Sequence, residues 1–202
     1  MDIVLNTRFV NSLLPRIPLP GFFDNFNRTA GQQLGFTSGE NRPWKLYSNG
    51  APSSWLITAS GTADYASGGG INVAAVDAFA NNGTLSVTLA AFSGSNRHAG
   101  PAFRVQDADN HYFVHQSDPA EGIKLYKRVN GAASLIASGT YLYNAGDVIS
   151  VLLSDANITV QVNGTTKITA SDTTFQGETQ HGLYANTDTP AFEWDDISFT
   201  AA

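Results

Sequence analysis

The sequence predicts an all-β fold, a two-sheet antiparallel jelly-roll sandwich. Two observations lead to this prediction. Apolar and polar residues alternate with a period of two in many short runs, and clusters of turn residues separate these runs. About a dozen such runs in 202 residues suit one sandwich domain, and no stretch shows the period of an amphipathic helix.

The alternation is clearest at Leu85, Val87 and Leu89, where every second side chain is apolar. Residues at i, i+2 and i+4 of a strand share one face, so such a run buries one side only. Taken in chain order, the predicted strands are 55–60, 71–78, 84–92, 100–106, 111–116, 122–129, 133–138, 147–153, 157–163, 167–170, 182–185 and 191–199.

Asn-Gly pairs stand between several of these runs, at Asn82-Gly83, Asn130-Gly131 and Asn163-Gly164. A two-residue type I′ turn needs positive φ at both central residues, and Asn-Gly provides this at low cost. The pairs therefore predict antiparallel hairpins.

Composition excludes several classes of protein. The chain has no cysteine, so it has neither a disulfide framework nor a cysteine nucleophile. A net charge of -6 argues against nucleic acid as a partner, because phosphates attract a basic face. The apolar runs are far shorter than the ~20 residues that span a membrane, so no membrane partner is expected.

The N-terminal 20 residues differ from the rest, and we expect an extended arm over 1–20 and one sandwich domain over 21–202. Pro15, Pro18 and Pro20 prevent a regular helix or central strand there. The arm is nevertheless apolar, and it could fold on its own domain, dock on a neighbouring subunit or remain a disordered tail. The candidate anchoring residues are Phe9, Leu13, Leu14, Ile17 and Leu19.

A family resemblance rests on motifs spread along the chain. They begin at Asp24-Asn25-Phe26-Asn27-Arg28 and end at Phe192-Glu193-Trp194-Asp195-Asp196-Ile197. Between them lie Gly100-Pro101-Ala102-Phe103-Arg104, Asp109-Asn110-His111-Tyr112-Phe113 and Leu125-Tyr126-Lys127-Arg128-Val129-Asn130-Gly131. Over about residues 22–200 the order resembles concanavalin-like (laminin G-like) jelly-roll domains of minor tail and other virion proteins of tailed bacteriophages.

The resemblance implies a non-enzymatic virion structural protein, a minor tail or capsid-decoration protein anchored by its N-terminal arm. It implies other virion subunits as partners and a homo-oligomer. The start of the chain lacks a basic region and a cleavage site, so no secretory signal is expected, and a protein made in the host cytoplasm would reach the virion. The alternative is a glycan-binding adhesion module for a host surface polysaccharide, and a glycoside hydrolase is a weaker alternative.

Catalytic motifs are missing from the sequence. Glucanase relatives of the fold carry Glu-x-Asp-x-x-Glu on one central strand, whereas this chain has only Glu193-Trp194-Asp195-Asp196 on its final strand. Phe192 and Trp194 alternate in one phase, and Ile197 and Phe199 alternate in the other. An extra residue at Asp195-Asp196 predicts a β-bulge there, so we expect no enzyme activity.

Metal binding has one candidate. The family sometimes holds one structural calcium ion, and Asp24 and Asp196 come from first and last strands that meet in such folds. The alternative is that Asp24 caps a turn and Asp196 sits in the bulge. No other cofactor is expected.

A glycan or partner surface follows from strand phase. If Phe103, Tyr112 and Ile123 face the core, then every second residue on the same strands faces outward. These outward residues are expected to share the concave face that the resemblance implies, or to form an ordinary solvated sheet face. The candidates are Arg104, Phe113, His115 and Tyr126.

Overall fold

The computed structural model describes residues 19–94, 98–116, 120–186 and 192–202. Within these residues the secondary structure is entirely β, which confirms the predicted fold class. No helix in the described parts of the chain is long and apolar enough to cross a membrane. Most predicted strands form, but the predicted ranges do not include the three short strands at 22–24, 45–48 and 63–67.

Fifteen strands make up the fold. They are β1 (Phe22–Asp24), β2 (Lys45–Ser48), β3 (Ser54–Ile57), β4 (Ala63–Ser67), β5 (Ile71–Asp77), β6 (Gly83–Phe92), β7 (Ala99–Phe103), β8 (His111–Gln116), β9 (Ile123–Val129), β10 (Ala132–Ser138), β11 (Val148–Ser154), β12 (Asn157–Val162), β13 (Thr165–Ser171), β14 (Gln180–Asn186) and β15 (Phe192–Ala201).

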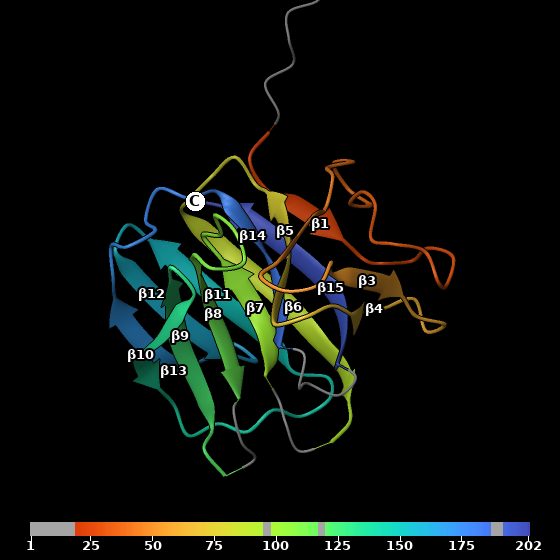
Figure 1. The fold of residues 1–202 in the computed structure, drawn as a ribbon. Coiled ribbons are helices and arrows are strands. Elements are labelled where there is room, and N and C mark those ends of the chain that lie inside the picture. The colour runs from red at the N-terminus through yellow and green to blue at the C-terminus, as the bar shows by residue number, and fades with distance from the viewer. Residues whose placement is uncertain (1–18, 95–97, 117–119, 187–191) are drawn as a thin grey trace, which may run out of the picture.

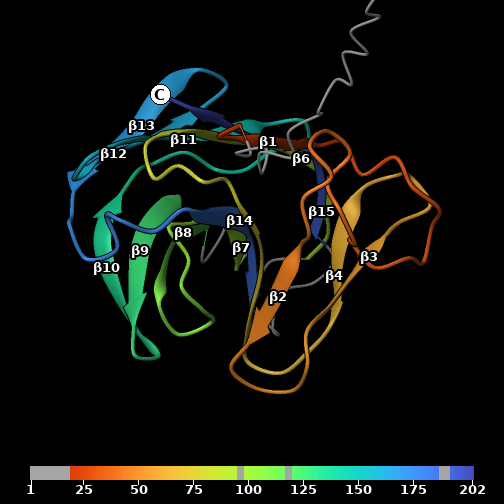
Figure 2. The same cartoon turned by 90° about the horizontal axis from the view of Figure 1, so that it is seen from above.

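The strands form two antiparallel sheets that pack face to face (Figure 1). The eight-stranded sheet has the order β13-β12-β11-β6-β15-β4-β3, with β1 paired to β15. The seven-stranded sheet has the order β10-β9-β8-β7-β14-β5-β2. In Figure 2 the seven-stranded sheet is curved, and its hollow side is turned away from the other sheet.

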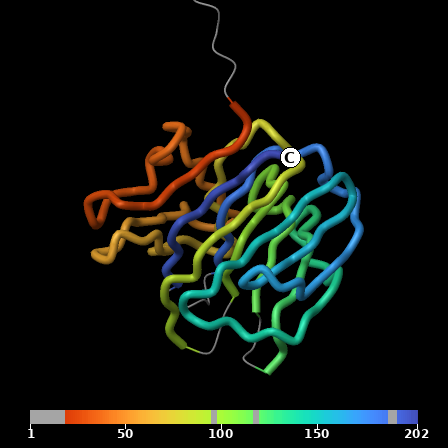
Figure 3. Tube along the Cα trace, turned by 180° about the vertical axis from the view of Figure 1, so that it is seen from behind, coloured from red at the N-terminus to blue at the C-terminus, as the bar shows by residue number. Residues whose placement is uncertain are grey.

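The two ends of the described chain meet in the eight-stranded sheet. Phe22 of β1 lies opposite Phe199 of β15, and Figure 3 shows the two strands side by side. This pairing joins residues that are 177 positions apart in the sequence.

The core between the sheets uses the inward half of each alternating run. Leu85, Val87 and Leu89 of β6 are fully buried, as the period of two predicts. Trp55 and Trp194 are fully buried as well. Burial of an apolar side chain of this kind contributes ~1.5–3 kcal/mol, so the inward half of the alternating runs is a large source of stabilisation.

The predicted bulge on the last strand is confirmed. The pairing of β15 with β6 shifts between Asp195 and Ser198, and Asp196 has a φ of 46°. The extra residue lets Trp194 and Ile197 both face the core, although they are three residues apart.

Only Leu19 among the candidate anchoring residues lies in the described part of the chain. It is 79% exposed, and its carbonyl oxygen accepts a hydrogen bond from Arg42 Nη2. Phe9, Leu13, Leu14 and Ile17 lie outside the described residues. The role of the arm and the boundary at residue 20 therefore stay predictions.

Candidate functional site

An apolar belt crosses the outer face of the seven-stranded sheet. Directly opposed residues on neighbouring antiparallel strands point to the same face. Tyr47 of β2 lies opposite Val73 of β5, which lies opposite Tyr184 of β14. On the other side of β7, Phe113 of β8 lies opposite Tyr126 of β9, which lies opposite Leu135 of β10. We call these six residues the belt.

Small residues on β7 let the two halves of the belt touch. Tyr184 is opposite Gly100, and Phe113 is opposite Ala102, so no large side chain stands between the two rings. The ring centroids of Phe113 and Tyr184 lie 4.3 Å apart, although β7 separates their strands. Phe113 also stacks on Tyr126 with centroids 5.3 Å apart. The three rings form one continuous aromatic surface.

Gly100 has no room for a side chain. A Cβ built there would lie 1.8 Å from the carbonyl oxygen of Val114. Gly182 on β14 is equally restricted, because its Cβ would lie 1.9 Å from the carbonyl oxygen of Ala74. The belt therefore depends on close approach of backbones that only glycine allows.

Accessibility differs along the belt. Phe113 and Tyr184 in the middle are 1% and 2% exposed, so their rings serve as packing. Tyr126 and Tyr47 are partly exposed, and Leu135 beside Tyr126 is 53% exposed. A ligand can therefore reach apolar surface at the two flanks, over Tyr126 and Leu135 and over Tyr47.

Two histidines on β8 flank the buried ring of Phe113. Burial lowers the pKa of His111 to about 4 and the pKa of His115 to about 3, so both rings are neutral at pH 7. His111 Nδ1 lies 3.1 Å from the carbonyl oxygen of Asp107, which makes Nδ1 the protonated nitrogen. His111 Nε2 is then an acceptor, and it has no hydrogen-bond partner among the described residues.

One end of this face is closed by three connected loops. Asn49 Nδ2 donates to Asp109 Oδ1 at 2.8 Å, which joins the β2–β3 loop to the β7–β8 loop. The backbone N–H of Asn130 donates to Asn110 Oδ1 at 3.0 Å, which adds the β9–β10 turn. The polar side chains at this end hold the loops in place and present amide and carboxylate groups beside the belt.

The structure brings together three of the four predicted site residues. Phe113, His115 and Tyr126 are mutual neighbours, with ring centroids between 5.0 and 5.3 Å apart. Only Tyr126 of the three is partly exposed, and its role in binding stays a prediction; Phe113 and His115 are buried and support the surface by packing. The sequence analysis missed Tyr47, Tyr184 and Leu135. Alternation within each strand is visible in the sequence, but which strands are neighbours is not.

The predicted position of Arg104 on this face is wrong. Arg104 follows the last residue of β7 and has a φ of 49°, so the backbone leaves the strand and the alternation ends there. Its side chain is fully buried and donates to the carbonyl oxygens of Asn81 and Asp155 and to Asn82 Oδ1. Arg104 thus ties together two turns at the edge of the core.

The proposed calcium pair does not form a suitable cation site. Asp24 is fully buried, and Arg28 binds both of its carboxylate oxygens at 2.8 and 3.0 Å. Trp44 Nε1 donates to Oδ2 at 2.7 Å, and the backbone N–H of Phe26 donates to Oδ1 at 3.0 Å. Asp196 is exposed. Because the lone pairs of Asp24 already accept four hydrogen bonds, this carboxylate does not fit a calcium ligand.

No group of three or more potential metal ligands occurs within the described residues. The structure does place Asp64 of β4 directly opposite Glu193 of β15, on the outer side of the eight-stranded sheet. Partial burial, together with the nearby charge of Glu193, raises the pKa of Asp64 to about 6. The two acids lie on the sheet opposite the belt, so they do not flank it.

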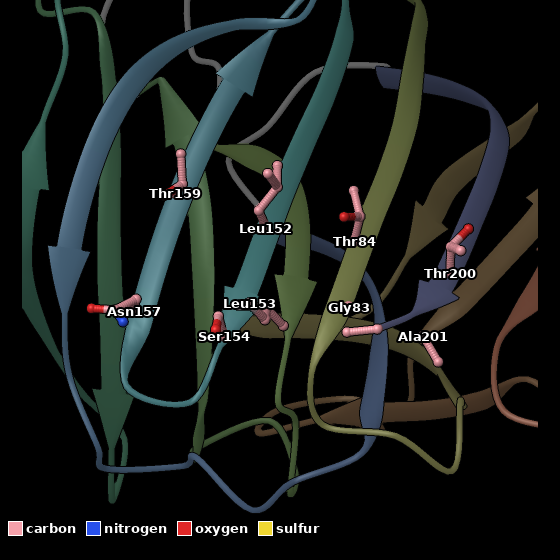
Figure 4. A pocket seen from close by; sticks show the side chains of 10 residues that line it. Gly83, Thr84, Leu152, Leu153, Ser154, Asn157, Thr159, Thr200 and Ala201 are labelled. Carbon is pink, nitrogen blue, oxygen red and sulfur yellow. The ribbon is translucent and has the colours of Figure 1, made fainter.

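The outer face of the eight-stranded sheet carries a shallow groove of about 400 Å³ (Figure 4). Thr159, Leu152, Thr84 and Thr200 form one row across four neighbouring strands. The groove has no aromatic ring, and its side chains are uncharged. It therefore lacks the stacking surface that sugar sites in sandwiches use.

No family model and no curated protein matches the chain. Solved structures do resemble it. The carbohydrate-binding module CBM66 from Bacillus subtilis has a TM-score of 0.61 and 20% identity, over 78% of this chain and 95% of that one. The β-glucanase of Bacillus licheniformis has a TM-score of 0.55 and 13% identity, over 91% of this chain and 99% of that one.

A third similar structure is domain 4 of AbnA, an extracellular GH43 arabinanase from Geobacillus stearothermophilus, solved in complex with arabinotriose. It has a TM-score of 0.54 and 12% identity, over 91% of this chain and 92% of that one. At these identities the similarity establishes the fold, a concanavalin-like sandwich, and does not decide whether this chain is an enzyme.

These similarities correct the expected function. The similar structures are carbohydrate-binding and glycoside-hydrolase domains, and they show no link to a phage tail protein. The sequence motifs that suggested a virion protein belong to the sandwich itself. In this chain they form turns, such as Asn130-Gly131, and buried core positions, such as Trp194, which are structural roles that do not separate one function from another.

Proposed function

We propose that this chain is a glycan-binding module, and that it binds a neutral oligosaccharide on the outer face of the seven-stranded sheet. The observation that carries the proposal is the belt, with Tyr126 and Leu135 accessible at one flank and Tyr47 at the other. Sugar sites combine apolar ring surfaces with a few fixed polar groups, and the belt lies beside the amide-rich loops at Asn49 and Asn110.

The belt favours binding over catalysis. A glycosidase of the common type needs two carboxyl groups on either side of the scissile bond, ~5–9.5 Å apart. Among the described acids on this side, Asp107 and Asp109 bond Asn110 and Asn49, and Asp77 accepts hydrogen bonds from the N–H of Phe79 and the hydroxyl of Thr179. These carboxylates are already held by fixed donors within the protein, which favours a structural role over acid–base catalysis.

The side-chain charges near the belt favour a neutral ligand. Lys124 on β9 is engaged by Glu121 at 2.5 Å, and Arg128 is bonded to the carbonyl oxygen of Gly131. The salt bridge offsets the charge of Lys124. Arg128 keeps its charge, but the carboxylates of Asp107 and Asp109 act on the same part of the face around His111 and oppose its attraction for an anionic sugar. The similar structures whose names mention sugar binding, including the domain solved with arabinotriose, support the same class of ligand.

A binding screen followed by titration tests the proposal. The full chain is applied to an array of neutral and anionic oligosaccharides, and its affinity for arabinotriose, laminaritriose and cellotriose is measured by calorimetry. We expect at least one neutral glycan to bind, and Tyr126→Ala to weaken that binding about tenfold or more, because a stacking surface is lost.

Val148→Ala is the matched control, since Val148 is 39% exposed on the eight-stranded sheet. It should bind like the wild type. Absence of binding to every neutral glycan, or equal binding by Tyr126→Ala and Val148→Ala, would contradict the proposal.

A further inference from the structure

A second pocket lies in the segment that joins β1 to β2, away from the flank of the belt formed by Tyr126 and Leu135. It has a volume of about 420 Å³ and is lined by Arg28, residues 32–38 and Asn41. Figures 1 and 2 both place this segment beside β3 and β4, on the other side of the molecule from β8 and β9. A ligand bound there would not touch Tyr126 or Leu135.

Phe36 gives this pocket an accessible aromatic ring. Its side chain is 54% exposed, whereas Phe113 in the belt is 1% exposed. Burying a ring of this size stabilises a protein by ~1.5–3 kcal/mol, so an exposed one leaves that apolar surface available to a ligand.

The backbone around Phe36 is held in place before any ligand arrives. The N–H of Thr37 donates to the carbonyl oxygen of Arg42 at 2.8 Å, and the N–H of Trp44 donates to that of Gly35 at 2.9 Å. The N–H of Arg42 also donates to Thr37 Oγ1 at 2.9 Å. Because the loop is cross-linked in this way, little entropy is lost when a ligand binds to it.

Polar groups with unused hydrogen-bonding capacity surround the ring. The side-chain amides of Gln32 and Asn41 are exposed, and neither has a side-chain partner among the described residues. Ser38 Oγ accepts a hydrogen bond from the N–H of Asn25 at 3.0 Å, which leaves its own hydroxyl proton to donate. Arg28 uses both terminal nitrogens on Asp24, so the pocket offers no free guanidinium fork for an anion.

We propose that the Phe36 pocket is a second glycan-binding site, which takes a neutral sugar unit stacked on Phe36 and bonded by the amides of Gln32 and Asn41. Amides both donate and accept, which matches sugar hydroxyls. This inference rests on the proposed function, and it makes the chain a two-site binder. Two separate sites favour ligands with many copies of the same unit, because a second contact within a polysaccharide network then forms at high effective concentration.

The test compares Phe36→Ala with Phe79→Ala, which truncates a phenylalanine that is 51% exposed and does not line the pocket. Calorimetry with arabinotriose, laminaritriose and cellotriose measures the stoichiometry. Co-sedimentation with insoluble arabinan, curdlan and cellulose measures the avidity. We expect the best trisaccharide to bind the wild type and Phe79→Ala at two sites and Phe36→Ala at one. We also expect Phe36→Ala to bind the matching polysaccharide at least tenfold more weakly.

Asn41→Gly gives an independent variant. Asn41 has a φ of 54°, which glycine adopts without strain, so the loop is kept while the amide is removed. We expect it to reproduce the loss seen in Phe36→Ala. Unchanged stoichiometry and avidity in both variants, with Tyr126→Ala defective, would overturn the second site and leave the proposed function standing. Absence of binding by the wild type to all six glycans would overturn both.

Discussion

The outer faces of the two sheets carry different kinds of side chain, although the strands of both sheets alternate in the same way. Both sheets alternate inward and outward side chains, and both bury their inward half in the same core. The eight-stranded sheet points a row of small polar residues outward, such as Thr84 and Thr159. The seven-stranded sheet points rings outward, and these pack into a second apolar cluster around Phe113.

The outer face of the eight-stranded sheet is an ordinary solvated surface, whereas the outer face of the seven-stranded sheet is a packed aromatic cluster. Thr84 and Thr159 are partly exposed and make no side-chain hydrogen bond among the described residues. Phe113 and Tyr184 lie on the outer face, yet they are buried because their rings stack with centroids 4.3 Å apart beside Gly100. Such close packing outside the main core is costly to disturb, so substitutions should separate the two faces clearly.

The largest expected effect comes from Gly100→Ala. A Cβ at this position would lie 1.8 Å from the carbonyl oxygen of Val114, and backbone cannot move aside as a flexible side chain does. We expect the free energy of unfolding to fall by roughly 4 kcal/mol, above the usual range for overpacking. Urea unfolding followed by circular dichroism measures it.

Thr84→Ala on the other face is the control for this substitution, and it should change stability by less than ~0.5 kcal/mol. Similar midpoints for the two variants would show that the seven-stranded sheet has the same tolerance as the eight-stranded one.

The next effect is a loss of stability in acid that depends on His111, on the outer face of the seven-stranded sheet. Burial holds the pKa of His111 at about 4, below its unfolded value near 6.5. Between about pH 6.5 and 4, His111 therefore binds a proton in the unfolded chain but not in the folded chain. The free energy of unfolding falls as the pH drops through this range. The shift corresponds to roughly 3 kcal/mol from this group alone.

His111→Asn isolates this contribution, because asparagine can still donate to the carbonyl oxygen of Asp107 but does not titrate. We expect its unfolding free energy, measured by urea titration at several pH values, to depend less steeply on pH between 6.5 and 4. An identical slope in wild type and variant would show that His111 is not a buried neutral group.

The smallest effect concerns the acid pair on the eight-stranded sheet. Partial burial, together with Glu193 directly opposite, raises the pKa of Asp64 to about 6. Its folded pKa lies above its unfolded value, so the contribution of this group to stability is lost as the pH rises through about 6. Asp64→Asn should therefore stabilise the protein at pH 7 by about 1 kcal/mol, after allowance for solvent screening.

The gain from Asp64→Asn should vanish below pH 4, where the aspartate of the wild type is protonated in both states. Asp196→Asn, at the exposed position in the bulge, is the control and should change little. Thermal unfolding at pH 7 and pH 3.5 measures both. Destabilisation by Asp64→Asn at pH 7 would mean that its carboxylate is needed for the hydrogen bond from the N–H of Phe192.

The sequence by itself determined the inward-facing side chains of several strands and the positions of several turns. Alternation identified the inward faces of β6 and β12, and the change of phase at Asp195-Asp196 located the bulge. Both are local properties, because the period of a strand and the conformation of a turn depend on residues close in sequence. The same reasoning placed Phe113, His115 and Tyr126 on one outward face.

Only the tertiary structure decided which strands are neighbours, and this decided the candidate sites. Tyr47 joins Tyr184 because β2, β5 and β14 pair, and the two tyrosines are 137 residues apart in the sequence. Arg104 does not lie on the outer face of the seven-stranded sheet, because the left-handed conformation after β7 directs its side chain toward Asn82 and Asp155. Strand order and local departures from the extended backbone depend on packing of the whole chain, so no pattern within a single segment reveals them.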